Sequence, residues 1–278
     1  MKKPMPRKFS LWEGFTIAVL AVIACVMLLP YVWMVLSSLK SNMDIVSGSG
    51  GFFPSKPSLD GYRTVFSEAP FVTWLLNSLV TSVIITVVTL FTSALAGYVF
   101  AKHQFKGKKL LFILILATMM IPFQVIMIPT YLITAELGLV NHLLAIILPN
   151  LVSSYGVFLA KQFIEEIPQE LLEAARMDGS GEFRLMLRIV MPLILPMLSA
   201  LGIFTFMNSW NNYLWPLIVL NDESKMTVPL ALVYFNGTHQ VNYNVVMSAA
   251  VLITIPVIIM FLIFQKQFIK GLAMTGMK

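Results

Sequence analysis

The chain has 278 residues, of which 58% are hydrophobic and only 12% are charged, and its formal net charge is +6. Soluble domains carry about 25% charged residues, so this composition excludes a single soluble domain and an intrinsically disordered chain. The single cysteine, Cys25, excludes an intrachain disulfide bond and a multi-cysteine zinc site.

Six long apolar runs without charged residues divide the chain. They cover residues 14–36, 70–101, 110–135, 137–160, 189–221 and 245–264. A transmembrane helix needs about 20 mostly apolar residues, and each run is long enough. Membrane β-strands would instead show segments of alternating hydrophobicity, which these runs lack. The sequence therefore predicts an all-α polytopic membrane protein with six transmembrane helices.

Lysine and arginine residues fall mainly on one side of these predicted helices. The N-terminal tail, the segments after the second and fourth helices and the C-terminal tail hold 15 of the 19, and the other segments hold four. Because basic residues concentrate on the cytoplasmic side, both termini are predicted to be cytoplasmic. The expected organisation is a tail (1–13), a transmembrane domain (14–268) with a cytoplasmic loop at about 161–188, and a second tail (269–278). Contact with membrane lipid explains the excess of basic residues, so no nucleic-acid partner is predicted.

Several kinds of chemistry have no motif in the sequence. No Gly-x-x-x-x-Gly-Lys-[Ser/Thr] pattern is present, so no ATP-binding loop is recognised. No span holds a paired-histidine or paired-carboxylate motif, so neither a metal site nor catalysis is predicted. No ionisable group lies deep in a span, which argues against an ion-coupled carrier, although some carriers bind sodium through carbonyls and hydroxyls alone. The chain is expected to be a transport pathway without its own energy source. A secondary transporter, a passive channel and a membrane scaffold are the alternatives.

The cytoplasmic loop at 161–188 has the features of a short helix between two transmembrane helices. Pro168 stands where a helix tolerates proline, in its first turn. One face of this helix is apolar, with Leu171, Leu172 and Ala175. Gly179 and Gly181 are both expected to supply the left-handed conformation that ends a helix. A second helical start is predicted at 182–188.

A longer pattern runs through this loop into the fifth predicted helix. Glu173-Ala174-Ala175 is followed after three residues by Gly179, and after nine more by Ile189-Val190-Met191-Pro192. This spacing resembles the loop of ABC importer membrane subunits, which reads Glu-Ala-Ala, three residues, Gly, nine residues, Ile-x-Leu-Pro. The one departure is Met191 for leucine, a swap between apolar side chains of similar size.

Other segments extend the resemblance over nearly the whole chain. They are Phe105-Lys106-Gly107-Lys108, Ile121-Pro122, the 136–142 turn ELGLVNH and Trp210-Asn211-Asn212-Tyr213. Together they look like the second permease subunit of carbohydrate ABC importers of the maltose-importer type. The family usually has an acidic residue where this chain has Asn212.

The resemblance implies an ABC importer permease fold in the bacterial plasma (inner) membrane. The implied partners are a second permease, a pair of cytoplasmic subunits that bind ATP and Mg, and an extracytoplasmic solute-binding protein that delivers a sugar. The loop helix would dock on the ATPase. The candidate coupling residues are Glu173, Ala174, Ala175, Asp178 and Gly179.

Polar and aromatic side chains near the end of the fifth predicted helix are candidates for the sugar pathway. They are Asn208, Trp210, Asn211, Asn212 and Tyr213. Amides can hydrogen-bond a sugar, and aromatic faces can stack on it. The alternative role is hydrogen bonding between helices, which membrane proteins use routinely.

Overall fold

The computed structural model describes residues 11–48, 51–237 and 242–275. Regular structure within those ranges is entirely helical, which confirms the predicted all-α class. The chain divides into two compact units, Met1–Ala69 with Phe235–Leu252 and Pro70–Tyr234 with Ile253–Lys278. The outer parts of both predicted tails, residues 1–10 and 276–278, lie outside the described residues.

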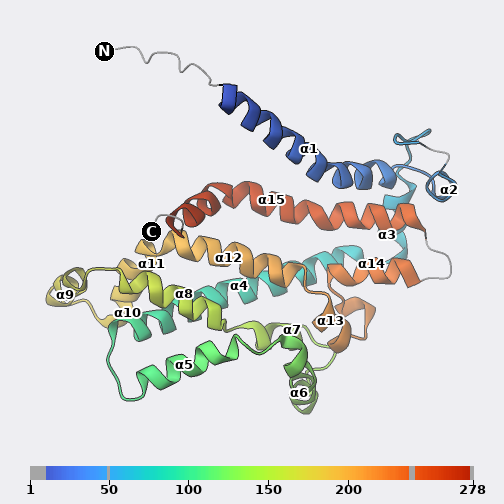
Figure 1. Cartoon of the computed structure of the whole chain (residues 1–278). Coiled ribbons are helices and arrows are strands. Elements are labelled where there is room, and N and C mark those ends of the chain that lie inside the picture. The colour runs from blue at the N-terminus through green and yellow to red at the C-terminus, as the bar shows by residue number, and fades with distance from the viewer. Residues whose placement is uncertain (1–10, 49–50, 238–241, 276–278) are drawn as a thin grey trace. The chain divides into compact units, whose positions relative to one another are not determined.

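The first unit holds the first apolar helix and the segment after it (Figure 1). Its elements are α1 (Leu11–Ser38), α2 (Asn42–Val46), α3 (Asp60–Glu68) and the first part of α15 (Tyr243–Thr275). The hydroxyls of Ser38 and Tyr62 lie 2.8 Å apart, and Ser248 Oγ donates to the Ser38 carbonyl oxygen at 3.3 Å. These bonds hold the end of α1 against α3 and α15.

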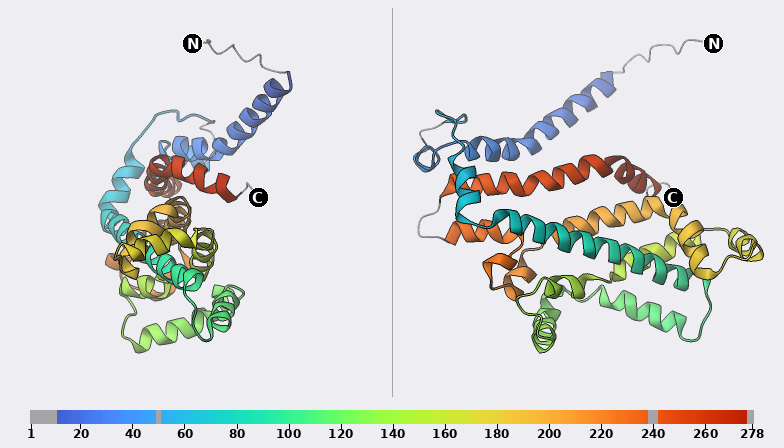
Figure 2. Two further views of the ribbon diagram at one scale, coloured as in Figure 1. Left: turned by 90° about the vertical axis from the view of Figure 1, so that its left-hand side faces the viewer. Right: turned by 180° about the vertical axis from the view of Figure 1, so that it is seen from behind.

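The second unit contains the remaining helices. They are α4 (Phe71–Lys102), α5 (Lys108–Thr118), α6 (Phe123–Glu136), α7 (Leu144–Ile147), α8 (Ser154–Glu165), α9 (Gln169–Met177), α10 (Glu182–Leu185), α11 (Met191–Leu193), α12 (Leu195–Trp210), α13 (Leu214–Val219) and most of α14 (Val228–Gly237). A π-helical turn, Met186–Val190, joins α10 to α11. In Figure 2, α9 and α10 lie at the C-terminal end of α4.

Helix α4 is the centre of the second unit, because it packs along both α8 and α12. Small residues let the helices approach closely: a Cβ added at Gly97 of α4 would lie 2.5 Å from the Cβ of Ala160 in α8. Gly156 of α8 is similarly close to Ser93 of α4. Membrane helices depend on such small residues for packing, since lipid gives no hydrophobic drive for helices to associate.

Two of the six predicted spans are bent instead of straight. Helices α5 and α6 meet at 100°, and the segment Glu182–Leu193 meets α12 at 81°. Pro122 lies at the first bend, and Pro192 and Pro196 flank the second. Proline lacks an N–H and disfavours helical geometry in the residue before it, so both bends have a local cause. Four described helices are long and apolar enough to cross a membrane, or up to six spans if each bent pair counts as one.

The fifth predicted span also ends earlier than expected, because α12 stops at Trp210 and α13 is a separate helix. Trp215 of α13 is buried, and its indole Nε1 donates to the Ala145 carbonyl oxygen at 2.9 Å. Its ring meets Phe123 edge-on, with the ring centres 5.7 Å apart. Trp215 therefore binds α13 to α6 and α7.

Candidate coupling helix and pathway residues

Helix α9 forms where the loop sequence predicts a helix. Pro168 precedes its first residue, and Glu170 in the first turn suits the positive end of the helix dipole. The side chain of Leu172 is fully buried in the core cluster that includes Ile164 and Leu185, and Ala175 packs against the same cluster. The apolar side of α9 therefore packs against the core of the second unit. Leu171, which the sequence predicts on that side, is exposed.

The end of α9 is a Schellman motif. The Gly179 N–H donates to the Arg176 carbonyl oxygen at 2.9 Å, and the Ser180 N–H donates to that of Ala175 at 3.0 Å. Gly179 has φ +79°, so its predicted left-handed conformation is confirmed. The same prediction for Gly181 is wrong: its φ is −69°, and it caps the start of α10 in an extended conformation.

The outer side of α9 carries four of the five candidate coupling residues. Glu173, Ala174, Asp178 and Gly179 are exposed. Met177, on the same side, is 88% exposed, and Ala175 faces inward. This surface is short, carries two carboxylates, and has small residues at Ala174 and Gly179, so another protein can approach its backbone closely.

Lys102, in the last turn of α4, holds the segment that leads into α9. Its Nζ donates to the carbonyl oxygens of Ile167 at 2.6 Å and Glu165 at 3.3 Å. One carbonyl belongs to the last residue of α8 and the other follows the helix, where acceptors lack intrahelical partners. A cation at this position also complements the negative end of the α8 dipole.

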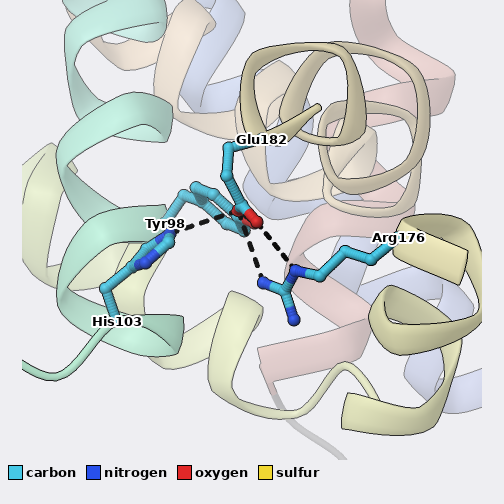
Figure 3. Close-up of polar contacts among 4 residues, drawn as sticks. All are labelled: Tyr98, His103, Arg176 and Glu182. Atoms are coloured by element: carbon cyan, nitrogen blue, oxygen red, sulfur yellow. Dashed lines mark hydrogen bonds and ion pairs between the residues drawn. The ribbon is translucent and has the colours of Figure 1, made fainter. Parts of the chain in front are cut away.

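Glu182, the first residue of α10, holds the segment that leaves α9 (Figure 3). Arg176 donates from Nε to Glu182 Oε1 at 2.7 Å and from Nη2 to Oε2 at 3.3 Å. The Tyr98 hydroxyl, from α4, donates to Oε2 at 2.5 Å. His103 Nε2 lies 3.3 Å from the same oxygen. The carboxylate thus joins α9, α10 and the last turns of α4.

These bonds shift the acid–base properties of the pair. The Arg176 guanidinium and then the Tyr98 hydroxyl favour the charged carboxylate and lower the pKa of Glu182 to about 2. The carboxylate in turn raises the pKa of Arg176. Glu182 precedes the apolar run that begins at residue 189, and 47% of its side chain is exposed. The pair is therefore ionised at neutral pH, in contact with water.

Sequence reasoning missed Tyr98, Lys102 and Glu182, which hold α9 in place. Tyr98 and Lys102 are four residues apart and so share one side of α4. A tyrosine and a lysine in the last turn of a membrane helix are ordinary interfacial residues, and nothing in the local pattern indicates their partners. Their signal is long-range: the Tyr98–Glu182 contact joins residues 84 positions apart.

The pathway candidates lie around the C-terminal end of α12. Asn208 and Asn211 are exposed, Asn212 is half-buried and Tyr213 is 37% exposed. Asn211 donates from Nδ2 to the Met207 carbonyl oxygen of its own helix at 2.9 Å. Trp210 differs from the others: its ring is buried and stacked on Phe206, with the ring centres 5.8 Å apart. Four of the five side chains are therefore at least partly accessible, and the Trp210 ring is buried.

Comparison with known proteins identifies the family. Residues 93–273 match the family described as "Binding-protein-dependent transport system inner membrane component". The chain is 37% identical over 274 residues to the arabinooligosaccharides transport system permease protein AraQ of Bacillus subtilis (strain 168), covering 98% of each chain. It is 32% identical over 257 residues to the lactose transport system permease protein LacG of Rhizobium radiobacter, covering 92% of this chain and 93% of the other.

A solved structure agrees with this match. The fold superposes with a TM-score of 0.81 and 26% identity on a chain of a bacterial ABC transporter involved in the import of the acidic polysaccharide alginate. The alignment covers 95% of this chain and 100% of the other. The family predicted from the loop motif is thereby confirmed. The chain belongs to the binding-protein-dependent inner-membrane transport components and is a multi-pass permease subunit of an ABC transporter, distinct from the ATPase.

Proposed function

We propose that this permease forms half of the pathway of an ATP-driven importer for a sugar or oligosaccharide, and that α9 is its contact with the ATPase. The sugar class is supported by the relatives, whose names concern arabinooligosaccharides, lactose and alginate. The partners are a second permease, two ATPase subunits that hold ATP and Mg, and a solute-binding protein on the outer side. Both termini of the chain face the cytoplasm.

The observation that carries the coupling role is the way α9 is held. Lys102 binds the chain before α9, the Tyr98–Glu182 contact binds the chain after it, and Leu172 is buried beneath it. No residue that the structure describes covers its outer surface around Glu173, Ala174 and Asp178 in this way. A helix fixed on one side and open on the other transmits force from a protein docked on the open side.

The experiment is sugar-stimulated ATP hydrolysis by the purified complex in lipid nanodiscs, with the solute-binding protein added. A panel of oligosaccharides with an amino acid as control identifies the solute class. We expect Ala174→Asp to lose the stimulation, because it places a charge in a close protein contact. Gln162→Asp adds the same charge at an exposed position on α8, outside α9, and is the matched control. Full stimulation in Ala174→Asp would overturn the coupling role, and stimulation only by amino acids would overturn the sugar class.

The accessible amides of Asn208, Asn211 and Asn212 at the end of α12 are proposed to contact the sugar. Replacing Asn208 or Asn212 by leucine is expected to reduce sugar uptake while the complex still assembles. If these amides instead hold helices together, assembly fails first, because each lost interhelical bond costs about 0.6–2 kcal/mol. Size-exclusion chromatography of the complex, run beside uptake, separates the two outcomes.

A further inference from the structure

A basic hollow lies between the start of α5 and the end of α8, and no pathway candidate lines it. Its volume is about 790 Å³, and its lining includes Gly107, Lys108, Lys109, Phe112, Lys161 and Glu165. Three lysines face one glutamate there. The lysines come from two segments about 50 positions apart in the chain, so the fold assembles this charge.

The three lysines differ in how far the protein already neutralises them. Lys161 is paired with Glu165 at 2.6 Å and lies over the Phe112 ring, 4.8 Å from its centre. Lys108 donates to the His103 carbonyl oxygen at 2.9 Å and has no acidic partner among the described residues. Lys109 is exposed and forms no ion pair with any residue that the structure describes. The hollow therefore keeps an uncompensated positive charge at Lys108 and Lys109.

The backbone adds to this charge. Lys108 and Lys109 stand in the first turn of α5, which holds no acidic residue. The N-cap is Gly107, at φ +84°, and it provides no side-chain oxygen for the N–H groups of that turn. Cations at the positive end of a helix are unfavourable, and a bound anion removes the penalty.

An apolar surface continues directly from the hollow along α5. Leu110, Ile113 and Leu114 are 62%, 50% and 53% exposed. A soluble anion would use only the lysines, whereas a molecule with an anionic head and a hydrocarbon chain would use both surfaces. Basic pockets between helices on the cytoplasmic side are suited to anionic lipid headgroups.

We propose that this hollow binds the headgroup phosphate of an anionic phospholipid through Lys108, Lys109 and the α5 N-terminus, with an acyl chain along the exposed side of α5. The site lies outside the sugar pathway and the outer surface of α9. This inference rests on the proposed cytoplasmic position of the α4–α5 turn. It does not depend on which solute the transporter carries.

The test uses the whole transporter complex in nanodiscs that contain photoactivatable phosphatidylglycerol, with mass spectrometry of the peptide that covers residues 104–113. Lys109→Gln should lower labelling of this peptide about fivefold, since it removes a direct contact between a lysine of the hollow and the headgroup phosphate. Lys106→Gln removes the same charge from the same turn, but Lys106 does not line the hollow, so labelling should change less than twofold. Equal losses in the two variants would mean diffuse attraction to the surface and would overturn the site.

A second lipid, a soluble competitor, a conservative variant and a stability control complete the test. Photoactivatable phosphatidylcholine, which has no net charge, should label the peptide weakly, and equal labelling by both lipids would overturn the anionic preference. Excess inorganic phosphate at constant ionic strength should leave the lipid label in place. If it abolishes the label, the ligand is a soluble phosphate and the lipid assignment is wrong. Lys109→Arg should retain labelling, and a thermal unfolding curve for each variant excludes misfolding as the cause of a loss.

Discussion

Replacing Gly97 by alanine tests whether the close α4–α8 contact governs the stability of the second unit. The added Cβ would lie 2.5 Å from the Ala160 Cβ, and 2.9 Å from both the Ala160 carbonyl carbon and the Lys161 nitrogen. Ordinary contact begins at 3.4 Å, so α8 has to move away by about 0.9 Å. Overpacking costs about 1–3 kcal/mol, and the better helix propensity of alanine returns about 0.5–1 kcal/mol. Because two of the three close atoms are backbone, the cost falls in the upper half of that range, and the expected net loss is about 1–2.5 kcal/mol.

The assay is thermal unfolding of the purified complex in mild detergent. Gly14→Ala is the matched control, because Gly14 is also helical but has no atom within 4 Å of an added Cβ. It should be neutral or slightly stabilising. Adding Ala160→Gly to Gly97→Ala should recover only part of the loss, since two of the three close atoms belong to the backbone. Wild-type stability in Gly97→Ala would refute the reasoning, and so would complete recovery in the double variant.

Three other predictions concern separate parts of the chain. Trp215→Phe should destabilise the complex by about 1–3 kcal/mol, since the buried Ala145 carbonyl loses its donor, and unchanged thermal unfolding would contradict this. The pKa of Glu182 is lowered from 4.5 to about 2, so its stabilisation is complete above about pH 4.5 and is lost as pH falls towards 2. Unfolding temperature should therefore fall more steeply over that window in the wild type than in Glu182→Gln, and parallel curves would count against it. In a cysteine-free background, a cysteine at Ser55 should react with an impermeant thiol reagent in intact cells and one at Lys106 should not, whereas the reverse would invert the topology.

The sequence predicts well wherever one short segment decides the structure. The apolar runs give the helical class, because their length matches a membrane and their composition rules out a soluble surface. The Schellman end of α9 follows from Gly179, since glycine adopts positive φ without steric cost. Gly181 carries the same local signal and lies at negative φ, because the start of α10 requires an extended residue there.

Long-range contacts account for what the sequence does not indicate. Trp215 resembles an interfacial aromatic in the sequence, yet it is buried and contacts Phe123 and Ala145 from other helices. The bends near Pro122 and Ile194 have proline signals, but apolar periodicity alone does not distinguish a straight span from a broken one. The contact between Tyr98 and Glu182 depends on how α4 meets α10, which no local pattern encodes.

The two attachments of the α9 loop to α4 have a consequence for how α9 moves. Two polar attachments define a line, and with Leu172 buried beneath α9 the motion they leave is a small rotation about that line. The attachments are Lys102 and Tyr98, one helical turn apart. While both hold, α9 can rock but cannot slide along the bundle, so a push on its outer side reaches α4 as a torque. A one-residue insertion between the two positions would turn one attachment away from the loop by about 100° and remove that axis altogether.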